Sequence, residues 1–162
     1  MASTLPVPIE FRLPEGWRPA LPDEVGAPEA AFVALHSGPD AGFTANITID
    51  GESRPGAALS ELADESVQRL RAVAESVAMV SRREAGSEAA PALTQKLTFS
   101  ALVRGVRRDL AQSQVYLGLL DTRDQRKQVV IRAYLTATAE QHDAVLADFQ
   151  AFVRTVRPDT EQ

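Results

Sequence analysis

Few residues in this sequence could act as nucleophiles, general bases or metal ligands. Cysteine is absent, and the two histidines, His36 and His142, lie far apart in the chain. Without cysteine there can be no disulfide, no thiol nucleophile and no metal site built on thiolates. Neither histidine belongs to a His-x₃-His or His-Glu pattern of the kind that binds zinc or iron. We therefore expect no metal site and no cofactor.

The sequence contains a serine, a histidine and an aspartate that could be grouped as a catalytic triad, but no motif supports this grouping. The combination is Ser113, His142 and Asp148, but the sequence has no Gly-x-Ser-x-Gly turn that would present a catalytic serine. The glycine spacing between Gly51 and Gly56 resembles a phosphate-binding loop, but no Lys-Ser or Lys-Thr pair follows it. We therefore predict no catalytic residues and a protein that is not an enzyme.

Four polar side chains are expected on an otherwise apolar face of a sheet. They are Gln95, Gln112, Gln114 and Tyr116. Burying an amide without a hydrogen-bond partner costs roughly 1–3 kcal/mol, so these groups require partners. Two interpretations stay open, namely a satisfied network inside the fold or a polar spot in a groove that binds a ligand or a client protein.

Basic residues gather at two predicted chain reversals. The clusters are Arg104, Arg107 and Arg108 at one reversal and Arg123, Arg126 and Lys127 at the next. Successive turns of a meander lie at opposite ends of a sheet, so the clusters cannot form one track along a nucleic-acid backbone. The net charge of −5 also has the wrong sign for a nucleic-acid binder. We interpret the clusters as solvated turns, with an acidic partner as the alternative.

The first elements that must position these residues are short strands. Residues 1–28 contain six prolines, which confine this N-terminal segment to short or edge strands such as the alternating residues 9–13. Two further strands are predicted at residues 31–36 and 43–49, and Asp50-Gly51 is expected to end the second.

Two amphipathic helices follow from apolar residues at three- and four-residue spacing. Residues 58–80 predict a long central helix, with a short strand at 81–84 after it. Thr138 and Gln141 have the spacing of a capping box before a second helix at 144–156. Pro158 is expected to end that helix and to leave residues 158–162 as a short tail.

An antiparallel meander is predicted between the two helices. Its strands are expected at residues 93–104, 107–120 and 128–138. Gly105 as the first loop residue predicts a type II′ hairpin that pairs Val103 with Arg108, and residues 121–127 hold the second reversal. The order of elements predicts an α+β domain whose antiparallel sheet is flanked by the long central helix and the C-terminal helix.

Alternation along the meander separates two faces. The predicted core face carries Leu93, Leu97, Phe99, Ala101, Val103, Leu110, Leu120, Val129, Ile131, Ala133 and Leu135. The other face is partly polar but also carries Leu102, Val115, Leu117, Leu119 and Tyr134. The middle strand is therefore apolar on both faces, so a helix, a second subunit or a client must cover each. We predict the second group as a partner interface.

The whole chain has the size and composition of one globular domain. It spans residues 1–162, of which 44% are hydrophobic and 24% charged. The N-terminus has neither the basic nor the apolar region of a secretory signal, and no window approaches the ~20 apolar residues of a spanning helix. We expect a cytoplasmic protein without membrane insertion.

The order of elements and three segments of the sequence resemble the Mog1/PsbP-like fold. The segments are Phe11–Trp17 (FRLPEGW), Phe43–Ile49 (FTANITI) and the closing helix Ala144–Val156. Within this group the chain is most similar to the bacterial LpqN and DcrB-related proteins. The resemblance implies an α/β/α sandwich without catalytic residues common to the family.

The resemblance also implies a kind of function. Known relatives are small binding proteins, among them a Ran-binding factor, a photosystem subunit, lipoproteins and chaperones for secreted effectors. We therefore expect a non-enzymatic adaptor or chaperone-like module for a secreted or assembled protein partner, or a homodimer. The alternative is a small-molecule-binding domain with a pocket between helix and sheet, in which Gln112, Gln114 and Tyr116 orient the ligand.

Overall fold

Seven antiparallel strands form one sheet in the order β2-β3-β4-β8-β7-β6-β5. The computed structural model describes residues 9–22, 30–38, 43–54, 56, 58–87, 90–120 and 128–158. The strands of the sheet are β2 (Trp17–Ala20), β3 (Phe32–His36), β4 (Asn46–Ser53), β5 (Glu75–Gly86), β6 (Pro91–Val103), β7 (Val106–Leu120) and β8 (Gln128–Thr138). The antiparallel sheet and the α+β class are as the sequence predicts.

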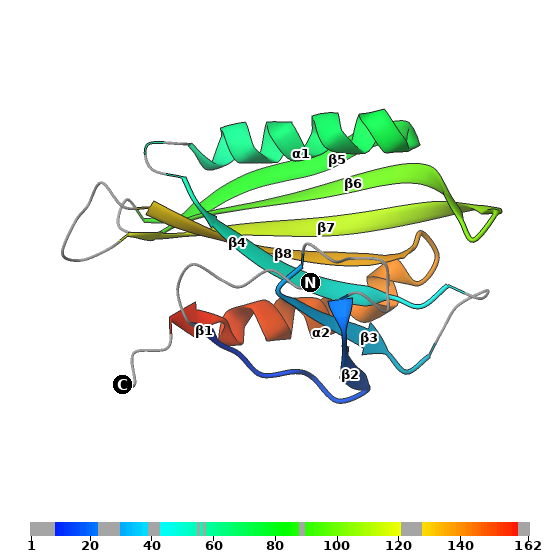
Figure 1. Ribbon diagram of the computed structural model, residues 1–162, viewed down its shortest axis with the longest axis horizontal. Coiled ribbons are helices and arrows are strands. Elements are labelled where there is room, and N and C mark those ends of the chain that lie inside the picture. The colour runs from blue at the N-terminus through cyan, green and yellow to red at the C-terminus, as the bar shows by residue number, and fades with distance from the viewer. Residues whose placement is uncertain are drawn as a thin grey trace.

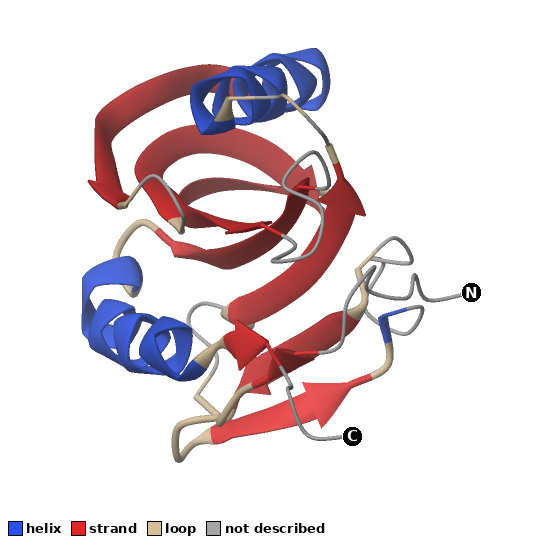
Figure 2. Ribbon diagram, turned by 90° about the vertical axis from the view of Figure 1, so that its left-hand side faces the viewer, coloured by secondary structure: helices blue, strands red, loops and turns tan. Residues whose placement is uncertain are grey.

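One helix covers each face of this sheet, as Figure 1 shows. Helix α1 (Leu59–Val73) packs on β5, β6 and β7, and α2 (His142–Thr155) packs on β7 and β8. We call the two sides the α1 face and the α2 face. The sheet is strongly curved (Figure 2). The apolar group on each face of β7 is therefore covered from within the chain.

A second, two-stranded sheet joins the two ends of the described chain. Strand β1 (Ile9–Glu10) pairs with β9 (Arg157–Pro158), and the Glu10 carboxylate forms an ion pair with the Arg157 guanidinium. The predicted strand at residues 9–13 is therefore shorter than expected. Phe11 and Leu13 lie beyond the end of β1 but pack against the core of the α2 face.

The predicted long central helix is wrong, because α1 ends at Val73 and β5 begins at Glu75. The Ala74 N–H still donates to the Leu70 carbonyl at 2.8 Å, and Ser76 then takes a left-handed backbone with φ of 55°. Bulges in the pairing of β5 with β6 shift the side-chain alternation. Val77, Ala78, Met79 and Val80 follow the apolar stripe of α1 closely in the sequence, so hydrophobic spacing alone does not mark where the helix ends.

The predicted hairpin register is also wrong by two residues. Val103 pairs with Val106 rather than with Arg108, so the loop is Arg104-Gly105. Both loop residues have positive φ, 52° and 80°, which is the type I′ rather than the type II′ conformation. A shift of two residues preserves the side-chain faces, so the predicted faces of β6 and β7 stay consistent with each other.

The predicted face of β8 is reversed, and β4 is longer than expected. Leu93 pairs with Tyr116, and Tyr116 pairs with Arg132, so Ile131 and its alternate neighbours lie on the α2 face. The sequence could not fix this parity because it depends on the reversal at residues 121–127, which lies outside the described residues. Strand β4 continues past Asp50-Gly51 to Ser53 because it pairs with β8 along its full length.

Candidate partner-binding surface at the hairpin end

The structure brings the four predicted polar residues together beneath α1. The Gln114 carbonyl oxygen accepts hydrogen bonds from Gln95 Nε2 at 2.6 Å and from the Tyr116 hydroxyl at 2.8 Å. The Gln114 amide nitrogen donates to Gln112 Oε1 at 2.6 Å and to Ser66 Oγ at 3.0 Å. The side chain of Gln114 is therefore fully hydrogen-bonded although it is only 1% exposed.

The same network fastens the sheet to α1. Gln95 Nε2 donates to the Ala63 carbonyl at 3.2 Å, and Gln95 Oε1 accepts from Arg82 at 2.8 and 3.0 Å. Arg82 also binds Asp64 on the helix at 2.7 Å. Burial raises the pKa of the Tyr116 hydroxyl, which keeps it a hydrogen-bond donor. This geometry supports the internal-network interpretation, and ligand binding by these residues stays a prediction.

The five residues predicted as a partner interface do not form one surface. Val115, Leu117 and Leu119 pack in the core beneath α2, whereas Tyr134 lies on the α1 face and touches the core there. Only Leu102 is open to solvent, with 75% of the residue exposed. The prediction of a partner interface therefore continues for Leu102 alone.

Two of the three residues considered as a catalytic triad lie within hydrogen-bond distance of each other in the structure. Ser113 Oγ lies 2.8 Å from His142 Nε2, but Asp148 accepts a hydrogen bond from the Trp17 indole at 3.0 Å instead. The neighbouring Asp143 lies 3.3 Å from His142 Nδ1, a contact that sequence reasoning missed. Burial lowers the pKa of His142, which is fully enclosed between the sheet and the start of α2. The hydrogen bond between Ser113 and His142 fastens the start of α2 to β7.

Large apolar side chains of the described residues are exposed at three places, one of which is Leu21 just after β2. In the described part of the chain the exposed ones are Leu21, Val73, Met79, Val80, Leu102 and Val106. Met79 and Val80 lie on the edge strand β5, whose bulges disrupt the regular edge that a further strand would need. Val73, Leu102 and Val106 lie instead where α1 ends and the β6–β7 hairpin turns.

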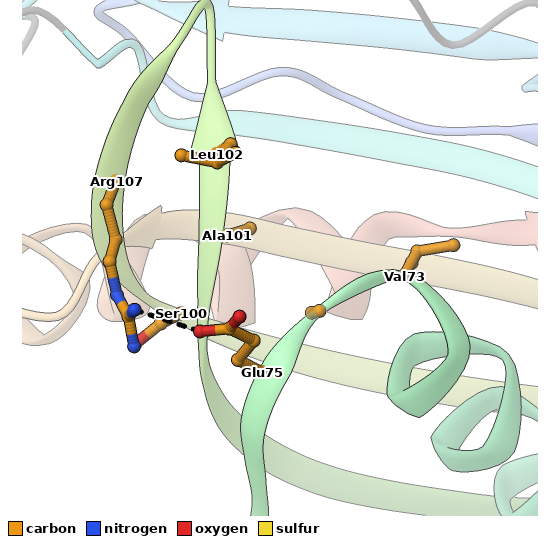
Figure 3. Close-up of a pocket in the computed structure, with 7 residues that line it drawn as sticks. Val73, Glu75, Ser100, Ala101, Leu102 and Arg107 are labelled. Carbon is orange, nitrogen blue, oxygen red and sulfur yellow. Dashed lines mark ion pairs between the residues drawn. The ribbon is translucent and has the colours of Figure 1, made fainter.

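A pocket of about 280 Å³ is lined by two of these residues, Val73 and Leu102. Its lining, which we call the hairpin-end surface, consists of Val73, Ala74, Glu75, Ser100, Ala101, Leu102 and Arg107. Figure 3 shows the side chains of Glu75 and Arg107 directed toward one another between the strands. Arg107 Nη1 lies 2.9 Å from Glu75 Oε2, and 60% and 70% of these side chains remain exposed. The pocket therefore combines an apolar rim with an accessible ion pair.

The first arginine cluster belongs to the same end of the molecule. Arg104 and Arg107 are exposed and Arg108 is half-buried. Among the described residues, only Arg107 of these three has an ion-pair partner. The second cluster, at residues 123–127, lies outside the described residues. The surface around the hairpin is thus locally basic although the chain carries a net charge of −5.

Comparison with known proteins identifies the fold. No family model and no curated protein sequence matches the chain, and no helix of its described part is long and apolar enough to cross a membrane. Among solved structures, LpqN of Mycobacterium tuberculosis, involved in cell envelope biogenesis, matches with a TM-score of 0.64 and 14% identity, over 98% of this chain and 89% of LpqN.

Two further structures have the same arrangement of helices and strands. Cyanobacterial PsbP from Synechocystis has a TM-score of 0.59 and 12% identity, over 93% of this chain and 86% of that protein. The Ran-binding protein Mog1p of Saccharomyces cerevisiae has a TM-score of 0.57 and 16% identity, over 93% of this chain and 89% of Mog1p. The chain therefore has the fold that LpqN, PsbP and Mog1 share.

Proposed function

We propose that this protein is a non-enzymatic binding protein whose hairpin-end surface docks a protein partner, in the manner of an adaptor or chaperone. The observation that carries the proposal is the exposure of Val73 and Leu102, at 79% and 75%, on the rim of one pocket. Exposed apolar groups gathered around a pocket are typical of interaction sites. The apolar side chains of the sheet interior are already covered by α1 and α2.

The charges of this end indicate the chemistry of the partner. Arg107 is held only by an exposed ion pair with Glu75, and Arg104 has no ion pair within the described chain. An exposed pair contributes little stability, so a carboxylate of the partner can replace Glu75 as the contact of Arg107. We infer a partner that inserts an apolar side chain beside acidic residues, because complementary charge steers association and fixes its register.

The shared fold supports a binding role without defining the partner. Mog1p is described as a Ran-binding protein, so one protein of this fold binds another protein. A fold hosts many functions, and the identity of the partner has to come from the surface of this chain.

The experiment is a capture of partners with three forms of the chain. Wild type, Leu102→Asp and Leu21→Asp are immobilised and exposed to a lysate of the source organism, and any captured protein is purified for direct binding. Leu21 is a matched control because it is 62% exposed but does not line this pocket. We expect a partner that binds wild type and Leu21→Asp and is lost with Leu102→Asp.

Two outcomes contradict the proposal. Equal binding to all three forms would show that the hairpin-end surface takes no part. A wild-type dimer in light scattering that Leu102→Asp converts to a monomer would assign the surface to a second copy of the chain instead of a different protein.

A further inference from the structure

A second pocket lies on the opposite face of the β6–β7 hairpin. Successive residues of a strand alternate between faces, so Arg108 lies on the α1 face and Arg107 on the other. The pocket has a volume of about 240 Å³, which is the space of roughly eight water molecules at about 30 Å³ each. Its lining consists of Leu35, Phe43, Thr44, Asn46, Val103, Arg104, Val106 and Arg108.

Apolar side chains form one part of the pocket wall. Phe43 is only 9% exposed because it packs in a cluster with Phe99 and Leu110. Val103 lies against the same cluster, and Val106 at the hairpin tip is 50% exposed. The wall is therefore anchored in the core on one side and open to solvent on the other.

Two guanidinium groups form the other part. Arg104 and Arg108 both line the pocket, no carboxylate of the described residues lines it, and neither arginine has an ion pair within the described chain. Arg108 Nε is moreover buried without any hydrogen-bond partner. A buried donor that lacks a partner is unfavourable, and an acceptor brought by a ligand would remove that penalty once the guanidinium turns toward the pocket.

The backbone at the hairpin tip also places an arginine where the local geometry does not favour one. Arg104 has φ of 52° at the first position of the type I′ turn. Asparagine, aspartate and glycine are the usual residues there, and a strained non-glycine residue often marks a functional site. From this position Arg104 lines the pocket.

We propose that this pocket binds a small organic carboxylate that carries a short apolar group. The carboxylate lies between the guanidinium groups of Arg104 and Arg108, and the apolar group lies against Phe43 and Val103. A guanidinium offers two parallel N–H donors that match the two oxygens of a carboxylate. The volume limits the ligand to a size below that of ordinary drug-like molecules. This pocket is distinct from the proposed partner surface, which uses Leu102 and Arg107 on the other face, and the exposed Arg104 at the hairpin tip is the one residue that both proposals use.

The test titrates the full chain with sodium hexanoate and follows backbone amide signals by NMR. Hexanamide and inorganic phosphate serve as probes that lack the charge and the apolar group, respectively. We expect hexanoate to shift the signals of the lining residues and to bind at least about tenfold more tightly than either probe, because hydrogen bonds to charged groups are the stronger ones.

Variants decide whether the arginines are responsible. Arg108→Gln and the exposed Arg104→Gln are each expected to weaken hexanoate binding by about tenfold or more. Arg83→Gln is the matched control, because Arg83 is an exposed arginine on β5 that lines neither pocket. Absence of hexanoate binding, equal binding of hexanamide, equal binding of phosphate, or unchanged affinity in both folded arginine variants would each overturn the proposal.

Discussion

At the scale of single residues, polar groups buried beneath the helices bear most of the structural constraint. Gln114 is at the centre of four hydrogen bonds, and His142 joins β7 to the start of α2 through Ser113. The sequence identified Gln114 and its neighbours as residues that require partners. It could not identify the partner Ser66, because α1 and β7 are brought together only by tertiary packing.

Replacing Gln114 with leucine is expected to lower the free energy of unfolding by about 2–4 kcal/mol. The variant removes the partner of several buried groups at once, and each orphaned group carries a penalty of about 1–3 kcal/mol. Urea unfolding measures the change, and Gln68→Leu on the exposed side of α1 is the control. Similar stability of the two variants would contradict a structural role for the network.

The buried His142 makes the stability depend on pH. Burial lowers its pKa in the folded protein, so between neutral pH and about pH 5.5 the unfolded chain binds a proton more readily. The free energy of unfolding should therefore fall as pH decreases through this range, by on the order of 1 kcal/mol. Urea titrations at pH 7.5 and 5.5 test this, and His142→Gln should lose the difference while His36→Gln keeps it. An unchanged difference in His142→Gln would contradict the assignment.

At the scale of elements, the sequence predicts each element where one period dominates and fails where a bulge intervenes. The first part of α1, from Leu59 onward, has a clear apolar stripe and lies where the sequence places it. The run from Val73 to Val80 keeps a helical spacing although Glu75 begins a strand. Tertiary pairing with β6 overrides the local pattern there, and no local signal marks the left-handed Ser76.

A glycine substitution at Ser76 tests where α1 ends, because the free energy of unfolding should rise if Ser76 is left-handed and fall if it is helical. Ser76 has φ of 55°, so Ser76→Gly should raise the free energy of unfolding by about 1 kcal/mol, because glycine adopts this conformation without strain. Ser60→Gly within α1 should lower it by about 0.5–1 kcal/mol. Thermal or urea unfolding distinguishes the two cases. A loss of stability in Ser76→Gly would indicate that the helix continues through this residue.

At the scale of the whole molecule, a sheet covered on both faces directs attention to its ends. The order of elements could be predicted from hydrophobic periodicity and turn residues, and the shared fold from the resemblance of three segments to the Mog1/PsbP-like fold. The hairpin-end surface could not be predicted from the sequence. Val73 looks like a core residue of a longer helix, and its exposure arises only because α1 ends there.

The proposed partner surface is tested most directly by photocrosslinking at a single position. A photoreactive amino acid replaces Leu102 in one form of the chain and the exposed Leu21 in a second, and both are irradiated in a lysate of the source organism. We predict one discrete crosslinked protein from position 102 and none from position 21. No crosslink at position 102, or the same products from both positions, would contradict docking at the hairpin-end surface.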